Sequence, residues 1–150
     1  MSHNPRLNQL RSRRSELKHA GRFREAIPLQ IQIIDLLETE GAAANELATA
    51  HNMASVLFLR SKLYSDAEEH ARRALSLHTG DSTKDHEAYG AYNLVMAQIL
   101  ASRFEYEDAA VFGEKAIEEY ARFHNPPDEF LSCVVAQVER MRNHTWSPDE

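Results

Sequence analysis

Apolar residues recur every three or four positions along most of the chain, which is the spacing of one face of an α-helix. The clearest stretch is Tyr64–Leu77, where an aromatic residue opens the segment and Ala67, Ala71 and Ala74 follow on one face. Small side chains on an inner face let a second helix approach closely. No stretch alternates apolar and polar residues with the period of a strand. The pattern therefore predicts an all-α protein.

Glycine, proline and short polar stretches divide this pattern into seven expected helices. Gly21 and Gly41 stand where the first two helices should end, and the prolines at 126 and 127 cannot continue a helix. The expected helices are residues 5–21, 23–40, 42–61, 64–78, 84–102, 106–123 and 128–143. We interpret the first six as three hairpins, and the seventh as a helix that covers the apolar face of the last hairpin.

One short phrase occurs three times along the chain. It reads Phe23-Arg-Glu-Ala26, then Tyr64-Ser-Asp-Ala67, then Tyr106-Glu-Asp-Ala109, and successive alanines are 41 and 42 residues apart. A fixed period of this size is typical of stacked helical pairs. It predicts a single domain of residues 1–150, with repeats at about 6–40, 43–78 and 84–123 and a capping helix at about 128–143.

The repeated phrase resembles the tetratricopeptide repeat, in which a Gly-x-aromatic-x-x-Ala turn joins the two helices of each hairpin. Residues 21–26 match that turn well, whereas Ser61-Lys62 and Ser102-Arg103 stand where the family often has glycine. The long spacing resembles the type found in kinesin light chains and in bacterial peptide-sensing regulators. The resemblance covers roughly residues 6–123 and implies a right-handed superhelix.

The resemblance also implies that the first helix of each hairpin lines a concave groove. Asn52 and Asn93 would then stand one repeat apart on the same wall, although Asn52 precedes Ala67 by 15 residues and Asn93 precedes Ala109 by 16. We therefore expect one turn to carry an extra residue. An asparagine amide both donates and accepts hydrogen bonds, as a bound peptide backbone requires. The expected peptide-binding groove consists of Asn52, Asn93, His51, Ser55, Phe58, Tyr89, Tyr92 and Met96.

A plainer interpretation of these residues stays open. The asparagines can bond only to neighbouring helices, and Phe58, Tyr92 and Met96 can be ordinary core residues. In one variant of the family, Lys and Arg beside such asparagines grip the carboxylate of a peptide. The corresponding neighbours here are His51, Ser55, Tyr89 and Met96, so a receptor for chaperone tails is not expected.

The remaining residue types favour no catalytic or metal chemistry. No two histidines are spaced four apart, no cysteine adjoins a histidine, and no glycine-rich phosphate loop exists. We expect His70 and His78 on solvated faces, and Cys133 buried in its apolar run. The carboxylates fit helix surfaces, as in the pair Glu68–Arg72. We expect no enzyme activity, no metal and no cofactor.

The charge balance of the chain disfavours two classes of binding partner. Seventeen Lys and Arg against 23 Asp and Glu give a net charge of −6, which argues against a general nucleic-acid binder and against an anionic membrane surface. The single cysteine and the absence of an apolar run of signal-peptide length lead us to expect a cytoplasmic protein.

The charge is also unevenly distributed. Residues 1–25 carry a net +5, and residues 105–150 carry a net −7. The basic first helix is open to three interpretations: a solvated face, a docking site for the acidic end of another copy or an acidic partner, or a contact with nucleic acid.

These observations predict a non-catalytic module that holds a peptide or helix of a partner protein in its groove, as an assembly or regulatory adaptor. The alternative is a structural subunit that assembles into a homo-oligomer, head to tail, through its basic and acidic ends. A third class, the accessory subunit of an enzyme, is not separated from the first by the sequence.

Overall fold

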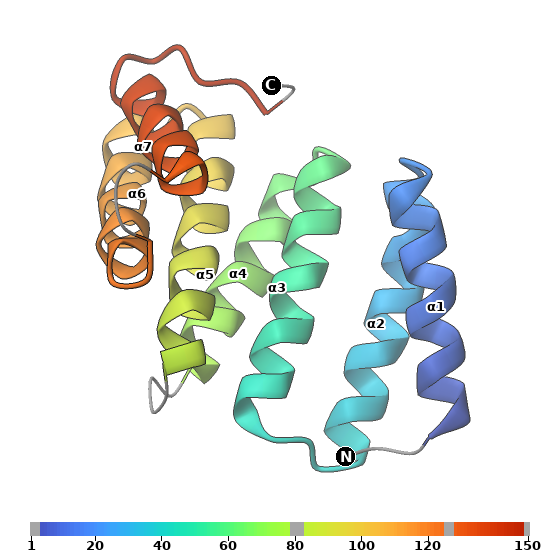
Figure 1. Cartoon of the computed structure of the whole chain (residues 1–150). Helices are drawn as coiled ribbons and strands as arrows, with labels where there is room; N and C mark the ends of the chain where they lie inside the picture. The colour runs from blue at the N-terminus through green and yellow to red at the C-terminus, as the bar shows by residue number, and fades with distance from the viewer. Residues whose placement is uncertain (1–3, 79–82, 125–127, 149–150) are drawn as a thin grey trace. The chain divides into compact units, whose positions relative to one another are not determined.

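The computed structural model describes residues 4–78, 83–124 and 128–148. The described residues form seven α-helices and no strand (Figure 1), so the prediction of an all-α protein is confirmed. The helices are α1 (Pro5–His19), α2 (Phe23–Thr39), α3 (Ala44–Arg60), α4 (Tyr64–Leu77), α5 (Thr83–Ser102), α6 (Tyr106–Ala121) and α7 (Glu129–Arg142). Both ends of each predicted helix lie within two residues of the ends of the corresponding observed helix.

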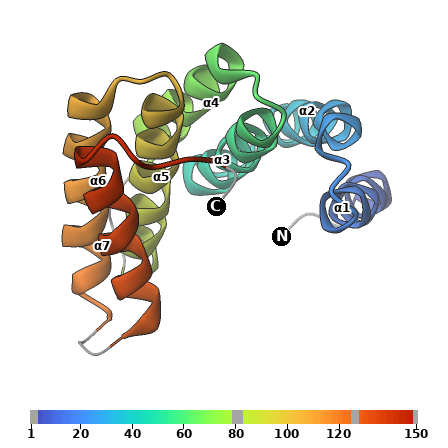
Figure 2. The ribbon, with the colours of Figure 1, turned by 90° about the horizontal axis from the view of Figure 1, so that it is seen from above.

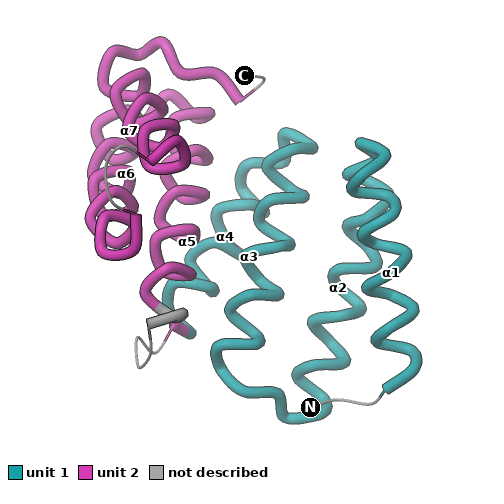
Figure 3. The backbone as a smooth tube through the Cα atoms, in the orientation of Figure 1, with its two compact units in different colours: residues 1–77 teal, residues 78–150 magenta. Residues whose placement is uncertain are grey.

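These helices fall into two compact units (Figure 3). Unit 1 is Met1–Leu77 and contains α1 to α4, and unit 2 is His78–Glu150 and contains α5 to α7. A single domain with a superhelical shape stays a prediction, because it concerns how the two units are joined.

Within unit 1, successive helices pack against each other in a zigzag. Seen from above, α1 and α3 lie on one side of the unit, and α2 and α4 lie on the other (Figure 2). Leucine and isoleucine side chains fill the space between α1 and α2, and Ala50 and Ala54 of α3 close it. The helices share an apolar core because each presents a stripe of residues three and four apart.

A buried glutamine joins three helices of this core. Gln30 of α2 is only 1% exposed, and its Oε1 accepts a hydrogen bond of 2.7 Å from Nη1 of Arg14 in α1. Its Nε2 donates a bond of 2.8 Å to the carbonyl oxygen of Ala50 in α3. A buried amide is costly without partners, and these two bonds offset that cost.

The α3–α4 hairpin is packed through the alanines that the sequence pattern singled out. Ala67, Ala71 and Ala74 are all buried, and they are the core residues of α4. Ser55 of α3 donates its hydroxyl to the carbonyl oxygen of Ala67 at 2.9 Å. A direct bond from one helix to the backbone of the next requires the close approach that alanine allows.

Unit 2 is a three-helix arrangement in which α6 packs against both α5 and α7. Tyr120 of α6 and Val134 and Val138 of α7 belong to its core. A Cβ atom built at Gly113 of α6 would lie 2.7 Å from a methyl carbon of Val138. Only glycine therefore allows α7 to lie so close to α6 at this point.

All three hairpin turns have the same backbone structure. Gly21, Lys62 and Phe104 each adopt a positive φ, of 75°, 62° and 65°. In each turn the amide of the following residue bonds to a carbonyl five positions earlier, which is the Schellman cap. The expectation of an extra residue in one turn was therefore wrong. Phe104, rather than Ser102-Arg103, occupies the place of Gly21.

The backbone conformation of the shared turn can be tested by substitution. A residue with a Cβ atom loses about 1–2 kcal/mol of conformational energy at positive φ, and glycine does not. We expect Lys62→Gly to raise the free energy of unfolding by about 0.5–1 kcal/mol. Gly21→Ala should lower it by about 1 kcal/mol through the backbone alone, since no atom lies within 4 Å of the added Cβ. Urea unfolding followed by circular dichroism measures both effects.

The matched control is Arg60→Gly, which places a glycine two residues earlier at a helical position and should destabilise the protein. If Lys62→Gly and Arg60→Gly change the free energy of unfolding in the same direction, the positive φ at Lys62 does not explain the effect of Lys62→Gly.

Candidate peptide-binding surface

Four of the eight residues that the family resemblance assigns to a groove lie on α3 in unit 1, namely His51, Asn52, Ser55 and Phe58. Arg11 and Asn52 each lie ten positions before the positive-φ residue of their turn, so they occupy equivalent places in the first two hairpins. Nη2 of Arg11 and Oε1 of Glu46 form an ion pair of 3.5 Å between α1 and α3. The α1–α3 side of unit 1 therefore combines charged groups with the asparagine amide.

Asn52 is partly exposed, but its Oδ1 is buried and has no hydrogen-bond partner among the described residues. An amide oxygen without a partner costs about 1–3 kcal/mol. A bound N–H group that reached this oxygen would supply the missing bond.

Asn93 occupies a different place from Asn52. It lies 11 positions before Phe104, so the common turn makes it equivalent to His51. Asn93 is 2% exposed, and its Nδ2 donates a bond of 2.8 Å to the carbonyl oxygen of Tyr89 in its own helix. Asn52 and Asn93 also belong to different units, so a groove that runs past both stays a prediction.

His51 and Ser55 face α4. Nδ1 of His51 lies 2.9 Å from Nδ1 of His70, and the ring of His70 also stacks on that of Phe58, with centroids 5.4 Å apart. His51 and Ser55 are buried, and Phe58 is partly exposed. The expectation that His70 lies on a solvated face was wrong, because it completes this stack between the two helices.

The three groove candidates of α5 differ in burial. Tyr92 and Met96 are buried, whereas Tyr89 is partly exposed and stacks on His78 with centroids 4.5 Å apart. His78, which was expected on a solvated face, is partly exposed and packs on this aromatic ring. Nζ of Lys115 lies 5.8 Å from the centroid of the Tyr89 ring. Of the eight predicted residues, Asn52, Phe58 and Tyr89 are partly exposed, and the other five are buried.

Glu119 is a buried charged residue that sequence analysis missed. It is 3% exposed, and its carboxylate contacts His86 at 3.1 Å and both Lys115 and Arg122 at 3.6 Å. The spacing of Lys115 and Arg122 is visible in the sequence, but the burial is not. A buried carboxylate needs such partners, and their number indicates a structural role within unit 2.

Cys133 is exposed, which corrects the expectation of a buried thiol. The inward positions of α7 follow the helical spacing of three and four, and they are Leu131, Val134, Val138 and Met141. Cys133 falls between them and faces outward. The predicted pair of Glu68 and Arg72 is confirmed at 3.0 Å.

The pair His51 and His70 predicts how the stability of the folded chain depends on pH. Burial, followed by the charges of His70 and Arg73, lowers the pKa of His51 from 6.5 to about 4. Burial also lowers the pKa of His70, against the opposing charges of Glu69 and Asp66. Between pH 6.5 and 4 the unfolded chain binds more protons than the folded chain, so stability falls as the pH falls.

We expect the difference in unfolding free energy between wild type and His51→Gln to shrink by about 2 kcal/mol from pH 7.5 to 4.5. Urea titrations at both values measure it, and His19→Gln on exposed α1 surface is the control. A difference in unfolding free energy that stays constant with pH would contradict the lowered pKa of His51 in the folded chain.

Among the described residues, no three His, Cys, Asp or Glu side chains are placed to hold a metal ion. None of the described helices is both long and apolar enough to cross a membrane. Comparison with protein-family models and with curated proteins gave no match to this chain. The likeness to tetratricopeptide repeats therefore rests on the repeated phrase, on the common turn and on a seven-helix fold that is compatible with a helical repeat.

Proposed function

We propose that this chain is a non-catalytic interaction module that binds a peptide or helix of a partner protein, as an assembly or regulatory adaptor. The observation that carries the proposal is the buried Oδ1 of Asn52, which has no partner among the described residues. Asn52 lies on the first helix of its hairpin, where the tetratricopeptide resemblance places ligand contacts. A peptide backbone supplies both the donor and the acceptor that an asparagine amide requires.

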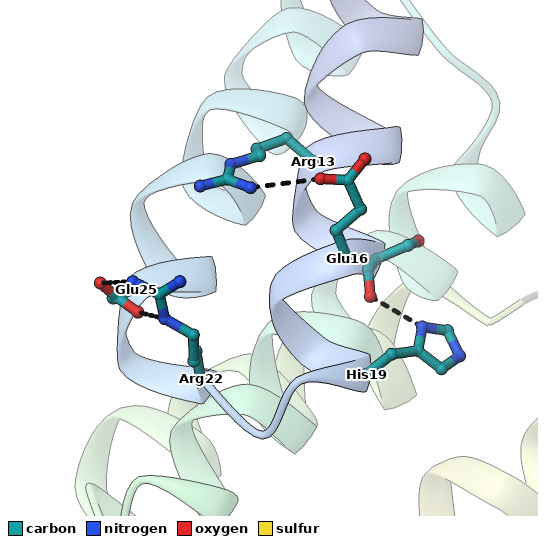
Figure 4. Close-up of polar contacts among 6 residues, drawn as sticks. Arg13, Glu16, His19, Arg22 and Glu25 are labelled. Carbon is teal, nitrogen blue, oxygen red and sulfur yellow. Dashed lines mark hydrogen bonds and ion pairs between the residues drawn. The ribbon is translucent and has the colours of Figure 1, made fainter.

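The α1 helix adds a second contact region to this proposal. Arg11, Ser12, Ser15, Glu16 and His19 line a shallow hollow along it. Glu16 is paired with Arg13 at 3.2 Å, and His19 bonds to the carbonyl oxygen of Ser15 (Figure 4). Arg11 occupies the place equivalent to Asn52 in the first hairpin and is paired with Glu46, so the ligand that fits best is a peptide with polar side chains.

The test is quantitative crosslinking mass spectrometry in native cells to identify the partner, followed by titration of that partner by calorimetry. We expect Asn52→Ala to weaken binding about tenfold, because one or two hydrogen bonds worth about 1–1.5 kcal/mol are lost. Arg73→Ala, on the exposed surface of α4, is the matched control and should leave the affinity unchanged. Equal affinities of wild type and Asn52→Ala would contradict the proposal.

A second candidate function is head-to-tail self-assembly. It is favoured by charge: residues 1–77, which make up unit 1, carry a net +2, and residues 78–150 of unit 2 carry a net −8. Opposite charges on two ends of one chain can join copies through a heterologous contact.

Light scattering at 20 mM and at about 500 mM salt tests this candidate, since the Debye length falls from roughly 20 Å to roughly 4 Å. We expect an assembly at low salt that dissociates at high salt. A particle of monomer mass at both salt concentrations would remove this function.

A further inference from the structure

The two hairpin turns of unit 1 lie next to each other and line an open hollow. It is lined by Gly21, Arg22, Phe23, Arg24, Glu25, Arg60, Ser61 and Lys62, and we call it the basic hollow. Nη2 of Arg24 donates a hydrogen bond of 3.4 Å to the carbonyl oxygen of Ser61, so the first turn of α2 is tied directly to the end of α3. Both hairpin turns of unit 1 therefore contribute to the basic hollow.

Positive charge dominates this hollow. Its lining contains four cationic side chains and one carboxylate, that of Glu25. Arg22 binds Glu25 through two hydrogen bonds, one of them 2.8 Å long (Figure 4). That pair is neutral, which leaves the charges of Arg24, Arg60 and Lys62. The side chains of Arg60 and Lys62 form no ion pair or hydrogen bond with the described residues.

Two helix ends add to the positive potential. The helix α2 begins at Phe23 and α4 begins at Tyr64, so both N-termini lie at the turns that form the hollow. The first amides of a helix have no partner within the helix and carry a partial positive charge. Arg22 at the start of α2 makes no side-chain cap. Cations at such a position destabilise a helix, whereas an anion stabilises it.

Ser61 provides the independent observation. It is 9% exposed and lines the hollow, and its Oγ is buried without a hydrogen-bond partner among the described residues. A buried hydroxyl without a partner costs about 1–3 kcal/mol. A hydroxyl can donate a hydrogen bond to an anionic oxygen, which would remove that cost.

We propose that the basic hollow binds a phosphate group, as inorganic phosphate or as a phosphate monoester. Three cations exceed the single charge of a carboxylate, whereas a phosphate monoester carries about −1.5 to −2 and three acceptor oxygens. Arginine guanidinium groups bind such oxygens in a bidentate way. Arg24, Arg60, Lys62 and the Ser61 hydroxyl hold the phosphate, together with the first amides of α2. This site does not depend on the proposed function on the α1–α3 side.

Nuclear magnetic resonance of the ¹⁵N-labelled full chain tests the site with inorganic phosphate as the probe. We expect the amide signals of residues 22–25 and 61–64 to shift saturably with phosphate, and not with sodium chloride of the same ionic strength. Signals that do not move, or that move equally with chloride, would overturn the proposal.

Arg24→Gln combined with Arg60→Gln should weaken phosphate binding at least about tenfold, because two charge-assisted contacts are lost. The matched control, Arg13→Gln combined with Lys18→Gln, removes the same charge from α1 outside the hollow and should retain the affinity within about twofold. Ser61→Ala keeps every charge and should still weaken binding measurably. The same spectra show that each variant is folded. Equal weakening in the control would overturn the proposal, since net charge alone would then explain the binding.

A second titration distinguishes the sources of the phosphate. A short phosphoserine peptide and its unphosphorylated form are compared with inorganic phosphate on the same amide signals. Tighter binding of the phosphopeptide than of phosphate assigns the site to a phosphorylated partner, and equal affinity assigns it to the free ion. Binding of the unphosphorylated peptide with the same affinity would overturn the proposal.

Discussion

The close approach of paired helices is the constraint on which the rest of this structure depends. In the second hairpin it is set by Ala67, Ala71 and Ala74, which occupy the whole buried face of α4. In unit 2 the same role falls to Gly113, where even a methyl group would meet Val138. Short distances between helix axes let single side chains reach the backbone of the next helix, as Ser55 does at Ala67. Larger residues at these places would separate the helices and break those bonds.

Close packing leaves little room for water, so the polar groups inside each unit must find partners in the protein. Gln30 and Glu119 show two solutions. Gln30 joins α1, α2 and α3 through its amide, and Glu119 is surrounded by His86, Lys115 and Arg122. The buried atoms of Asn52 and Ser61 that lack partners are among the exceptions to this rule. Both lie in unit 1, one on the α1–α3 side and one at the turns, and both proposals start from them.

The two proposed sites use different physical chemistry. The α1–α3 side offers an amide and an arginine, which suit the directional hydrogen bonds of a peptide backbone. The basic hollow offers concentrated positive charge and helix N-termini, which suit a compact anion. Binding at the first proposed site would depend mainly on geometry, whereas binding at the second would also depend strongly on ionic strength. An adaptor with both proposed sites would bind the backbone of a partner at one and respond to the charge state of the partner at the other.

The sequence alone determined the seven helices, because apolar spacing, glycine, proline and the repeated phrase act locally along the chain. It did not determine which polar residues lie inside. Helical spacing shows which residues share a face, but a helix in a hairpin has several faces, and only the packing of its neighbours decides which of them are covered. His70 and Cys133 were therefore assigned to the wrong environments, and the burial of Glu119 was missed. Lys62 and Phe104 likewise adopt a glycine-like backbone that their residue types do not predict, because the bonds of the common turn offset the strain of a side chain at positive φ.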